Sequence, residues 1–318
     1  MARLCKVVLG EWIPPHKRLP VAKWYRLLGE LRSMSPALSR TGGLFSVLQH
    51  AFSRGDQRRL RLSQRVYDVA AEFTALVDSL AECPTRLLEL VPTAPLHVGA
   101  CDACRHRMGG IWLDATGAAA PIILWRQSFS SPRVSADLIT ADHPTGSITI
   151  SDFEIAGIIS HKNIIAQACN VCERNLWIAS NDRATVPWSH KGSSTSTTAR
   201  AYLLHFNALH QCRHRYLARH HYMPSPINAK ADDTRRQCEL SDAHLITQFS
   251  CSYPQEHSRE LYHLPSETNA SVTDVLYRRH PPWMSLYSNS LSSASAQAPS
   301  PPAATLSALG QWRTLYKR

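Results

Sequence analysis

The sequence predicts an α/β fold in which a mixed five-stranded sheet is flanked by helices and preceded by a mostly helical, basic module. Strand-like and helix-like segments alternate from residue 96 onward in the order β-β-β-α-β-α-β-α. The first 92 residues instead repeat apolar residues at helical spacing. With 318 residues, 44% of them hydrophobic, the chain is long enough for one good core plus an additional module.

The N-terminal module is predicted as a group of helices. Apolar residues recur at helical spacing over residues 21–34 and 63–80, and shorter helices are expected at 44–52 and 85–91. A dense arginine cluster lies before and at the start of the third helix, and with Lys191 it supplies the candidate nucleic-acid-binding residues: Arg54, Arg58, Arg59, Arg61 and Arg65. The cluster is either a solubilising loop or a contact for a phosphate backbone.

The sheet begins with two strands, residues 96–104 and 109–114, joined by a tight turn. Residues 121–128 form the third strand. Ser151-Asp152 offers an N-cap for a helix over residues 152–169, and 175–180 is a short buried strand.

The second half of the sheet is predicted in the same way. The Ser/Thr-rich segment 192–198 precedes a helix over 198–217, a strand at 218–223 and a last helix that begins near Asn228. The predicted units are a helical segment, a sheet domain, a partly helical extension and a Ser/Ala/Pro-rich disordered tail: residues 1–92, 93–242, 243–287 and 288–318.

Composition narrows the partners and the compartment. A formal charge of +11 and a pI near 9.4 favour a polyanionic partner, most often nucleic acid, although a solvated basic surface is the alternative. No apolar run approaches the roughly 18 residues that cross a membrane, and the N-terminus lacks the pattern of a signal peptide. Nine scattered cysteines predict reduced thiols in an intracellular protein, nuclear or cytoplasmic.

Four acidic residues are the candidate site residues: Asp102, Glu154, Asp182 and Asp232. Asp102 lies in the first strand, where an unpaired acid between buried strands would be costly. Carboxylates that converge from separate elements suggest a site for hard divalent metals. Taken singly, the helix acids could instead be ordinary first-turn residues favoured by the helix dipole.

The element order and the positions of these acids resemble the ribonuclease H fold. More narrowly, the chain resembles the ribonuclease H domain of DIRS-like, tyrosine-recombinase retroelement polyproteins, through the phrases DACRHRMGGIW, ISDFEIAGIISH, IASNDRATVPWSHKGS and HHYMPSPINAKADDTRR. Upstream, WYRLLGELRSMSPALSRTGGLFSVLQ is similar to the segment that links the polymerase thumb to that domain. The resemblance covers residues 9 to about 285. No Tyr-x-Asp-Asp signature occurs, so a polyprotein fragment without the polymerase palm is expected.

The resemblance implies hydrolysis of the RNA strand of an RNA–DNA hybrid. Two Mg²⁺ (or Mn²⁺) ions about 4 Å apart would activate water and stabilise the leaving 3′ oxygen. It implies that Asp102 bridges both metals, that Glu154 and Asp182 complete the site, and that Asp232 binds one metal. RNA would be recognised by its 2′-hydroxyls. The implied partners are the hybrid and the missing polymerase and recombinase parts of the element.

The sequence departs from the family pattern at three places. The pattern has Asp-Asn where this chain has Asn181-Asp182, and a one-residue shift turns a strand side chain to the other face. Asp182 reaches the metals if the strand ends at Ser180; otherwise the enzyme is dead or very slow. Arg107 stands where a glycine is usual, and Arg235-Arg236 where the pattern ends Ser-Arg.

Two other functions remain open. One is a non-catalytic, nucleic-acid-binding remnant of a reverse transcriptase polyprotein. The other is a zinc-stabilised nucleic-acid-binding protein, because Cys101-x-x-Cys104 and Cys169-x-x-Cys172 have ligand spacing beside a His-rich run: His205, His210, His214, His220 and His221. Against zinc, residues three apart in a strand point to opposite faces.

Overall fold

We describe the protein from a computed structural model. The structure describes residues 18–34, 41–50, 59–82, 84–85, 91, 94–116, 120–129, 136–192, 199–254 and 257–278. The helix predicted at 85–91 and the tail predicted at 288–318 lie mainly or wholly outside these residues.

The N-terminal module is a small helical unit with its own core. It consists of β1 (Arg18–Pro20), α2 (Val21–Met34), α3 (Gly42–His50), β2 (Arg59–Arg61) and α4 (Gln64–Glu82). The apolar stripes of its helices meet in one cluster in which Trp24, Leu44 and Phe73 are fully buried. The prediction of helices is therefore confirmed, except that part of the arginine cluster forms β2, which pairs antiparallel with β1.

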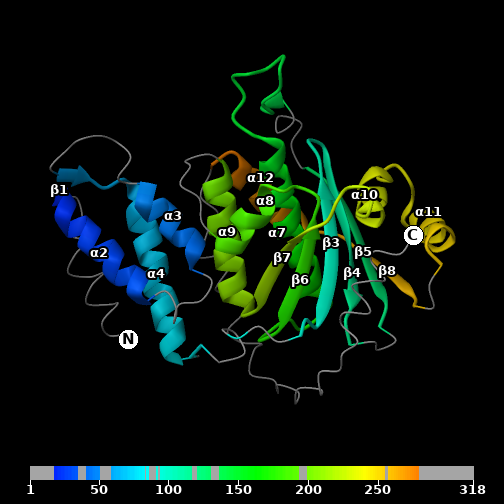
Figure 1. The fold of residues 1–318 in the computed structure, drawn as a ribbon, viewed down its shortest axis with the longest axis horizontal. Helices are drawn as coiled ribbons and strands as arrows, with labels where there is room; N and C mark the ends of the chain where they lie inside the picture. The colour runs from blue at the N-terminus through cyan, green and yellow to red at the C-terminus, as the bar shows by residue number, and fades with distance from the viewer. Residues whose placement is uncertain are drawn as a thin grey trace.

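The rest of the described chain builds one mixed sheet with helices on both faces (Figure 1). Its strands are β3 (His97–Ala103), β4 (Arg107–Asp114), β5 (Ile122–Ser128), β6 (Asn175–Ser180), β7 (Leu217–Tyr222) and β8 (Arg259–Tyr262). They lie in the order β7-β6-β3-β4-β5-β8. β4 is antiparallel to β3 and β5, whereas β3-β6, β6-β7 and β5-β8 are parallel pairs.

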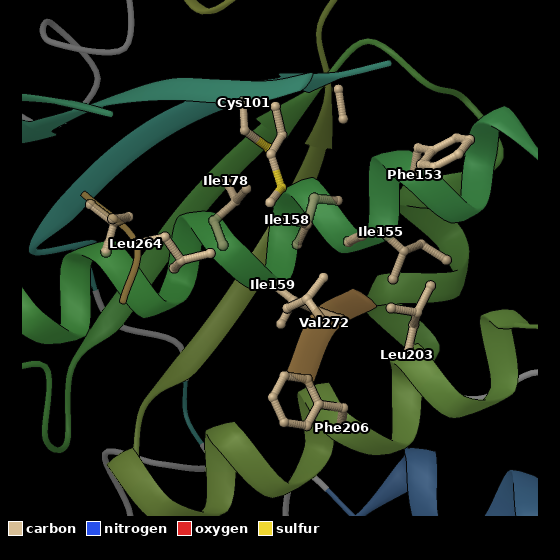
Figure 2. Close-up of a cluster of buried hydrophobic side chains, with 14 of the residues drawn as sticks. Cys101, Phe153, Ile155, Ile158, Ile159, Ile178, Leu203, Phe206, Leu264 and Val272 are labelled. Atoms are coloured by element: carbon tan, nitrogen blue, oxygen red, sulfur yellow. The ribbon is translucent and has the colours of Figure 1, made fainter. Parts of the chain in front are cut away.

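The helices that follow are α7 (Ile150–Ala168), α8 (Thr185–Lys191), α9 (Ala199–His214), α10 (Ala229–Arg236), α11 (Asp242–Ser252) and α12 (Ser266–Leu276). The main core joins α7, α9 and α12 to one face of the sheet. Figure 2 shows Cys101 of β3 pointing into this core, toward Ile158 of α7, with Phe206 of α9 and Val272 of α12 completing it. None of the helices described is long and apolar enough to span a membrane.

A second cluster covers the opposite face of the sheet. Val98 and Ala100 of β3 lie there with Ala231 of α10 and Phe249 of α11. Every residue of β3 is buried, because both faces of this central strand are covered. Alternation along β3 therefore sends Cys101 toward α7 and Asp102 toward α10.

The α/β class and the mixed sheet are confirmed. Five strands were predicted for this sheet, and the described residues form six. The additional strand is β8, from a segment predicted only as a partly helical extension. It is four residues long and half-exposed, so it lacks the apolar alternation that identifies a strand. The same segment supplies Val272 and Leu276 of α12 to the main core.

The start of α7 is also corrected. The helix begins at Ile150 and its N-cap is Thr149, not Ser151. The Thr149 hydroxyl accepts from the backbone N–H of Asp152, and the Asp152 carboxylate accepts from the Thr149 backbone N–H at 2.8 Å. This reciprocal pair is a capping box, which satisfies two backbone donors at once.

Candidate carboxylate site

Asp102 occupies a buried position near the C-terminal end of the central strand β3, only 4% exposed. Its partner across the antiparallel pair is Gly109 of β4. β3 pairs with β4 along its whole length, whereas its pairing with β6 ends at Ala100; the Asp102 carboxylate faces α10.

Arg235 of α10 bridges two of the candidate acids. Its Nε donates to Asp102 Oδ2 at 2.5 Å, and its other guanidinium nitrogen donates to Asp232. Arg236, which is largely exposed, donates to the second oxygen of Asp232 at 2.6 Å. Asp102, for which the sequence offered no partner, is therefore paired with Arg235. The sequence analysis noted Arg235 only as a departure from the family pattern.

The close approach of α10 to the sheet depends on Gly109. A Cβ at that position would lie 2.8 Å from the Arg235 backbone nitrogen and 2.9 Å from its Cα. A side chain there would push α10 away from β4. The absence of a side chain opposite Asp102 is thus what brings Arg235 within reach of it.

The two acids at the start of α7 have different environments. Asp152 belongs to the capping box, as a first-turn acid should. Glu154, two residues on, is 4% exposed and turns toward the sheet. Its carboxylate accepts from the Ala103 backbone N–H and from the Ser180 hydroxyl, each at 3.4 Å. Glu154 is therefore the α7 acid that lies at the ends of β3 and β6.

Asp182 follows the end of β6, which terminates at Ser180, the condition under which the sequence allowed it to approach the other acids. Its carboxylate accepts from the Ala184 backbone N–H at 2.8 Å and from the Thr185 hydroxyl at 2.7 Å, at the start of α8. Asn181 turns away and donates to the Ser225 hydroxyl at 3.3 Å. Asp182 is linked to Glu154 through Ser180, whose hydroxyl accepts from the Asp182 backbone N–H and donates to the Glu154 carboxylate.

The electrostatics of the site show that the acids interact. Burial raises the pKa of Glu154 well above its usual range, and the charges of Asp102 and Asp182 raise it further. Burial also raises the pKa of Asp102, against the opposing effect of Arg235. For Asp232, burial acts in the same direction, but hydrogen bonds from Arg236 and Arg235 prevail and lower its pKa.

The residues fit a divalent cation in their chemistry. Four carboxylates from β3, α7, the β6–α8 turn and α10 supply hard oxygen donors, and negative charge accumulates around buried Glu154. As the side chains stand, no group of three or more His, Cys, Asp or Glu in the described part of the chain is placed to hold a metal ion. Arg235 holds Asp102 and Asp232, and Asp182 is bonded to the start of α8.

The zinc alternative receives no support from the residues described, since none of their Cys and His side chains form a group that could hold a metal ion. Cys101 is fully buried against α7, whereas the neighbours of Cys104 include Arg235 and Cys238. Two of the histidines form other contacts: His205 Nε2 lies 2.6 Å from Glu72, and His210 Nδ1 lies 2.8 Å from the Tyr216 hydroxyl.

The predicted basic residues are only partly placed. Arg54 and Arg58 lie outside the described residues, as does the side chain of Arg61. Arg59 and Lys191 are exposed. Arg65 differs, because its guanidinium stacks at 3.2 Å on the Tyr202 ring of α9 and joins the helical module to the sheet domain. Arg65 therefore lies at the interface between the two parts, and its phosphate contact stays a prediction.

An arginine–aromatic pair beside the site was missed by the sequence analysis. Tyr222 ends β7 directly opposite Ser180, is 37% exposed, and lies beneath Arg183, whose guanidinium carbon is 4.9 Å from the ring centroid. The only sequence signal was that Arg183 follows Asp182. Tyr222 comes from a different strand, so its proximity depends on the register of β6 and β7.

No protein-family model matches the chain, and no curated protein matches it significantly.

Proposed function

We propose that the chain is a ribonuclease H-like domain, derived from a retroelement reverse transcriptase polyprotein, that hydrolyses the RNA strand of RNA–DNA hybrids. The observation that carries the proposal is that the four acids, from separate elements, share bonding partners at one end of β3. Arg235 joins Asp102 to Asp232, Glu154 accepts from the N–H of Ala103, and the Ser180 hydroxyl bonds to both Glu154 and the backbone N–H of Asp182. The order of elements around them, three antiparallel strands and then alternating helices and strands, supports it.

The carboxylates have distinct tasks in this proposal. Mg²⁺ or Mn²⁺, when bound, would supply an activated water and stabilise the leaving 3′ oxygen. Asp102, Glu154, Asp182 and Asp232 would hold the ions. Asp102 shares Arg235 with Asp232, and Glu154 accepts from the backbone N–H of Ala103, the residue after Asp102. Ser180 and the Ala103 backbone N–H orient Glu154.

The surface around the acids suits a nucleic-acid strand. Arg183 and Tyr222 offer a cation and an aromatic ring next to Ser180, and a base or ribose can stack on such a ring. Exposed Lys191, at the end of α8, lies next to the N-terminus of α3, where Gly42 approaches the Lys191 carbonyl oxygen. A phosphate backbone that leaves the acids along α8 would therefore meet the basic helical module.

A cleavage assay tests the proposal. The full chain is incubated with an RNA–DNA hybrid labelled on the RNA strand, in Mg²⁺ and separately in EDTA. We expect Mg²⁺-dependent cleavage that Asp102→Asn abolishes and that Asp68→Asn, an α4 substitution in the helical module, leaves intact. Cleavage that persists in Asp102→Asn would overturn the assignment of the site.

One observation favours a second candidate, a non-catalytic binder of RNA–DNA hybrids. Arg235 already forms ion pairs with both Asp102 and Asp232 in the folded chain. A protein that only binds would retain the fold, the Arg183–Tyr222 pair and the basic module. Hybrid binding in a filter assay, together with no Asp102-dependent cleavage in Mg²⁺ or Mn²⁺, is the result that identifies this function.

A further inference from the structure

We infer that Arg235 is an internal cation of the carboxylate site, and that a divalent metal binds there only by displacing its guanidinium. The inference rests on the proposed function for the identity of the metal, but its test measures metal binding rather than hydrolysis. It adds to the site a residue that sets metal affinity without being a metal ligand.

The first argument for this inference is the position of the Arg235 guanidinium between two carboxylates. The guanidinium of Arg235 spans Asp102 and Asp232, donating to one oxygen of each. Its side chain is 15% exposed, and that of Asp102 5%, so water screens this pair poorly. A metal held by Asp102 and Asp232 would compete with this guanidinium for the two carboxylates, and the two cations would repel one another.

The second argument is that the backbone of β4 and of α10 holds Arg235 in this position. Gly109 leaves room for the Arg235 backbone to approach β4, opposite Asp102. The Cys238 thiol donates to the Arg235 carbonyl oxygen at 3.2 Å and ties the end of α10 in place. Arg235 thus reaches Asp102 from an anchored helix end.

The third argument is the balance of carboxylates and positively charged side chains in the site. Glu154 accepts bonds of 3.4 Å from the Ala103 N–H and the Ser180 hydroxyl, and neither donor carries a charge. The site has four carboxylates, and two guanidinium groups, those of Arg235 and Arg236, bond to them. A divalent ion therefore still has an electrostatic reason to enter, and Arg235 determines how much its entry costs.

The test compares Mn²⁺ binding by the full chain and its variants, measured from the electron paramagnetic resonance signal of free Mn²⁺. We expect Arg235→Gln to bind Mn²⁺ more tightly than the unmodified protein by about tenfold or more, the usual scale of coupling between two ligands. Arg236→Gln is the matched control. It removes a positive charge and one bond to Asp232 from the same helix, yet leaves Asp102 paired, so its affinity should remain near that of the unmodified protein.

Two further variants keep the test decisive. Arg235→Lys preserves the charge and protects the fold, but a single ammonium cannot span both carboxylates, so it too should bind Mn²⁺ more tightly. Adding Asp102→Asn to Arg235→Gln should remove the gain. The inference is overturned if neither Arg235 variant binds more tightly, if Arg236→Gln gains as much, or if the gain survives loss of Asp102.

The outcomes also separate the inference from the proposed function. Suppose that the unmodified protein cleaves the hybrid in an Asp102-dependent way and that all variants bind Mn²⁺ with equal affinity. The internal-cation inference would then be wrong, and the nuclease function would keep its support. If the unmodified protein does not cleave the hybrid and Mn²⁺ binds tightly only after Arg235 is replaced, the internal-cation inference is supported. The non-catalytic binding function is then the one that remains.

Discussion

Lys162 shows how one buried side chain can govern the pH dependence of stability. It lies on α7 with no exposed surface, and its ammonium group donates to the Asn207 side-chain oxygen at 2.6 Å. Burial lowers its pKa from 10.5 to about 7. The amide neutralises no charge, so the folded state favours the uncharged amine at alkaline pH.

The sign of the effect follows from this lowered pKa. Between pH 7 and 10.5 the unfolded chain binds more protons at Lys162 than the folded chain does. The free energy of unfolding should therefore rise with pH across this window, by up to about 1.4 kcal/mol per pH unit. In Lys162→Met this contribution is absent, and urea unfolding at several pH values measures the difference.

Lys191→Met is the control for this prediction, because it removes an exposed lysine from α8. Its pH dependence should follow that of the unmodified protein. An identical pH dependence in Lys162→Met and the unmodified protein would show that Lys162 is not the group responsible.

At the scale of single residues, the sequence identified the acids but not their partners. Asp102 and Glu154 could be selected because strand and helix patterns place them on predictable elements. Arg235 could not, since its contact with Asp102 spans more than a hundred residues and depends on the space left at Gly109. Tyr222 was not predicted as a site residue either, because its neighbours depend on the register between β6 and β7.

Among the elements, α7 shows how local capping determines which acid faces the site. The capping box uses Asp152, and the turn of the helix then directs Glu154 toward the ends of β3 and β6. A helix that began at Ser151 or Asp152 would give both acids different positions relative to the first turn. The start of α7 is therefore tied to the geometry of the carboxylate site.

We expect Thr149→Ala to lower the free energy of unfolding by about 1 kcal/mol, since it removes the hydroxyl of the capping box. Thr149→Ser, which keeps a capping hydroxyl, should remain close to the unmodified protein. Urea unfolding followed by circular dichroism measures both. Equal losses in the two variants would mean that packing of the Thr149 methyl group, and not the cap, stabilises this end of α7.

The long elements were predictable and the short ones were not. Helical spacing of apolar residues identified α2 and α4, and a polar segment that could cap a helix marked the start of α7 and of α9. β1 and β2 are three residues each, and β8 is four. A strand this short repeats its pattern at most twice, so pairing partners far away in the chain decide whether it forms.

Across the whole molecule, α9 is the element on which the two parts of the protein meet (Figure 1). One side contributes Leu203 and Phe206 to the main core, and Leu209 belongs to the core of the helical module. Buried His205 faces Glu72 of α4 at 2.6 Å across this interface. The module is thus packed on the sheet domain through a buried surface.

Gly43 makes the contact between α3 and α9 possible, and its replacement should loosen it. A Cβ at Gly43 would lie 2.2 Å from the Leu204 carbonyl oxygen. We expect Gly43→Ala to lower the free energy of unfolding by about 1–3 kcal/mol, as overpacking does, and to increase hydrogen exchange in α3 and α9.

Gly29→Ala is the matched control, since a Cβ there meets nothing within 4 Å. Because alanine favours a helix more than glycine does, it should stabilise α2 by up to about 1 kcal/mol. Unchanged exchange in Gly43→Ala would show that α3 can move without weakening its contact with α9.

β8 also has a practical consequence for producing the protein in pure form. It pairs with β5 from Ile122↔Arg259 to Trp125↔Tyr262, so it covers backbone groups that would otherwise form an open sheet edge. A chain truncated after residue 242 would expose that edge and lose the apolar side chains of α12 from the core. We expect such a chain to aggregate on a sizing column, whereas the full chain should elute as a single folded species.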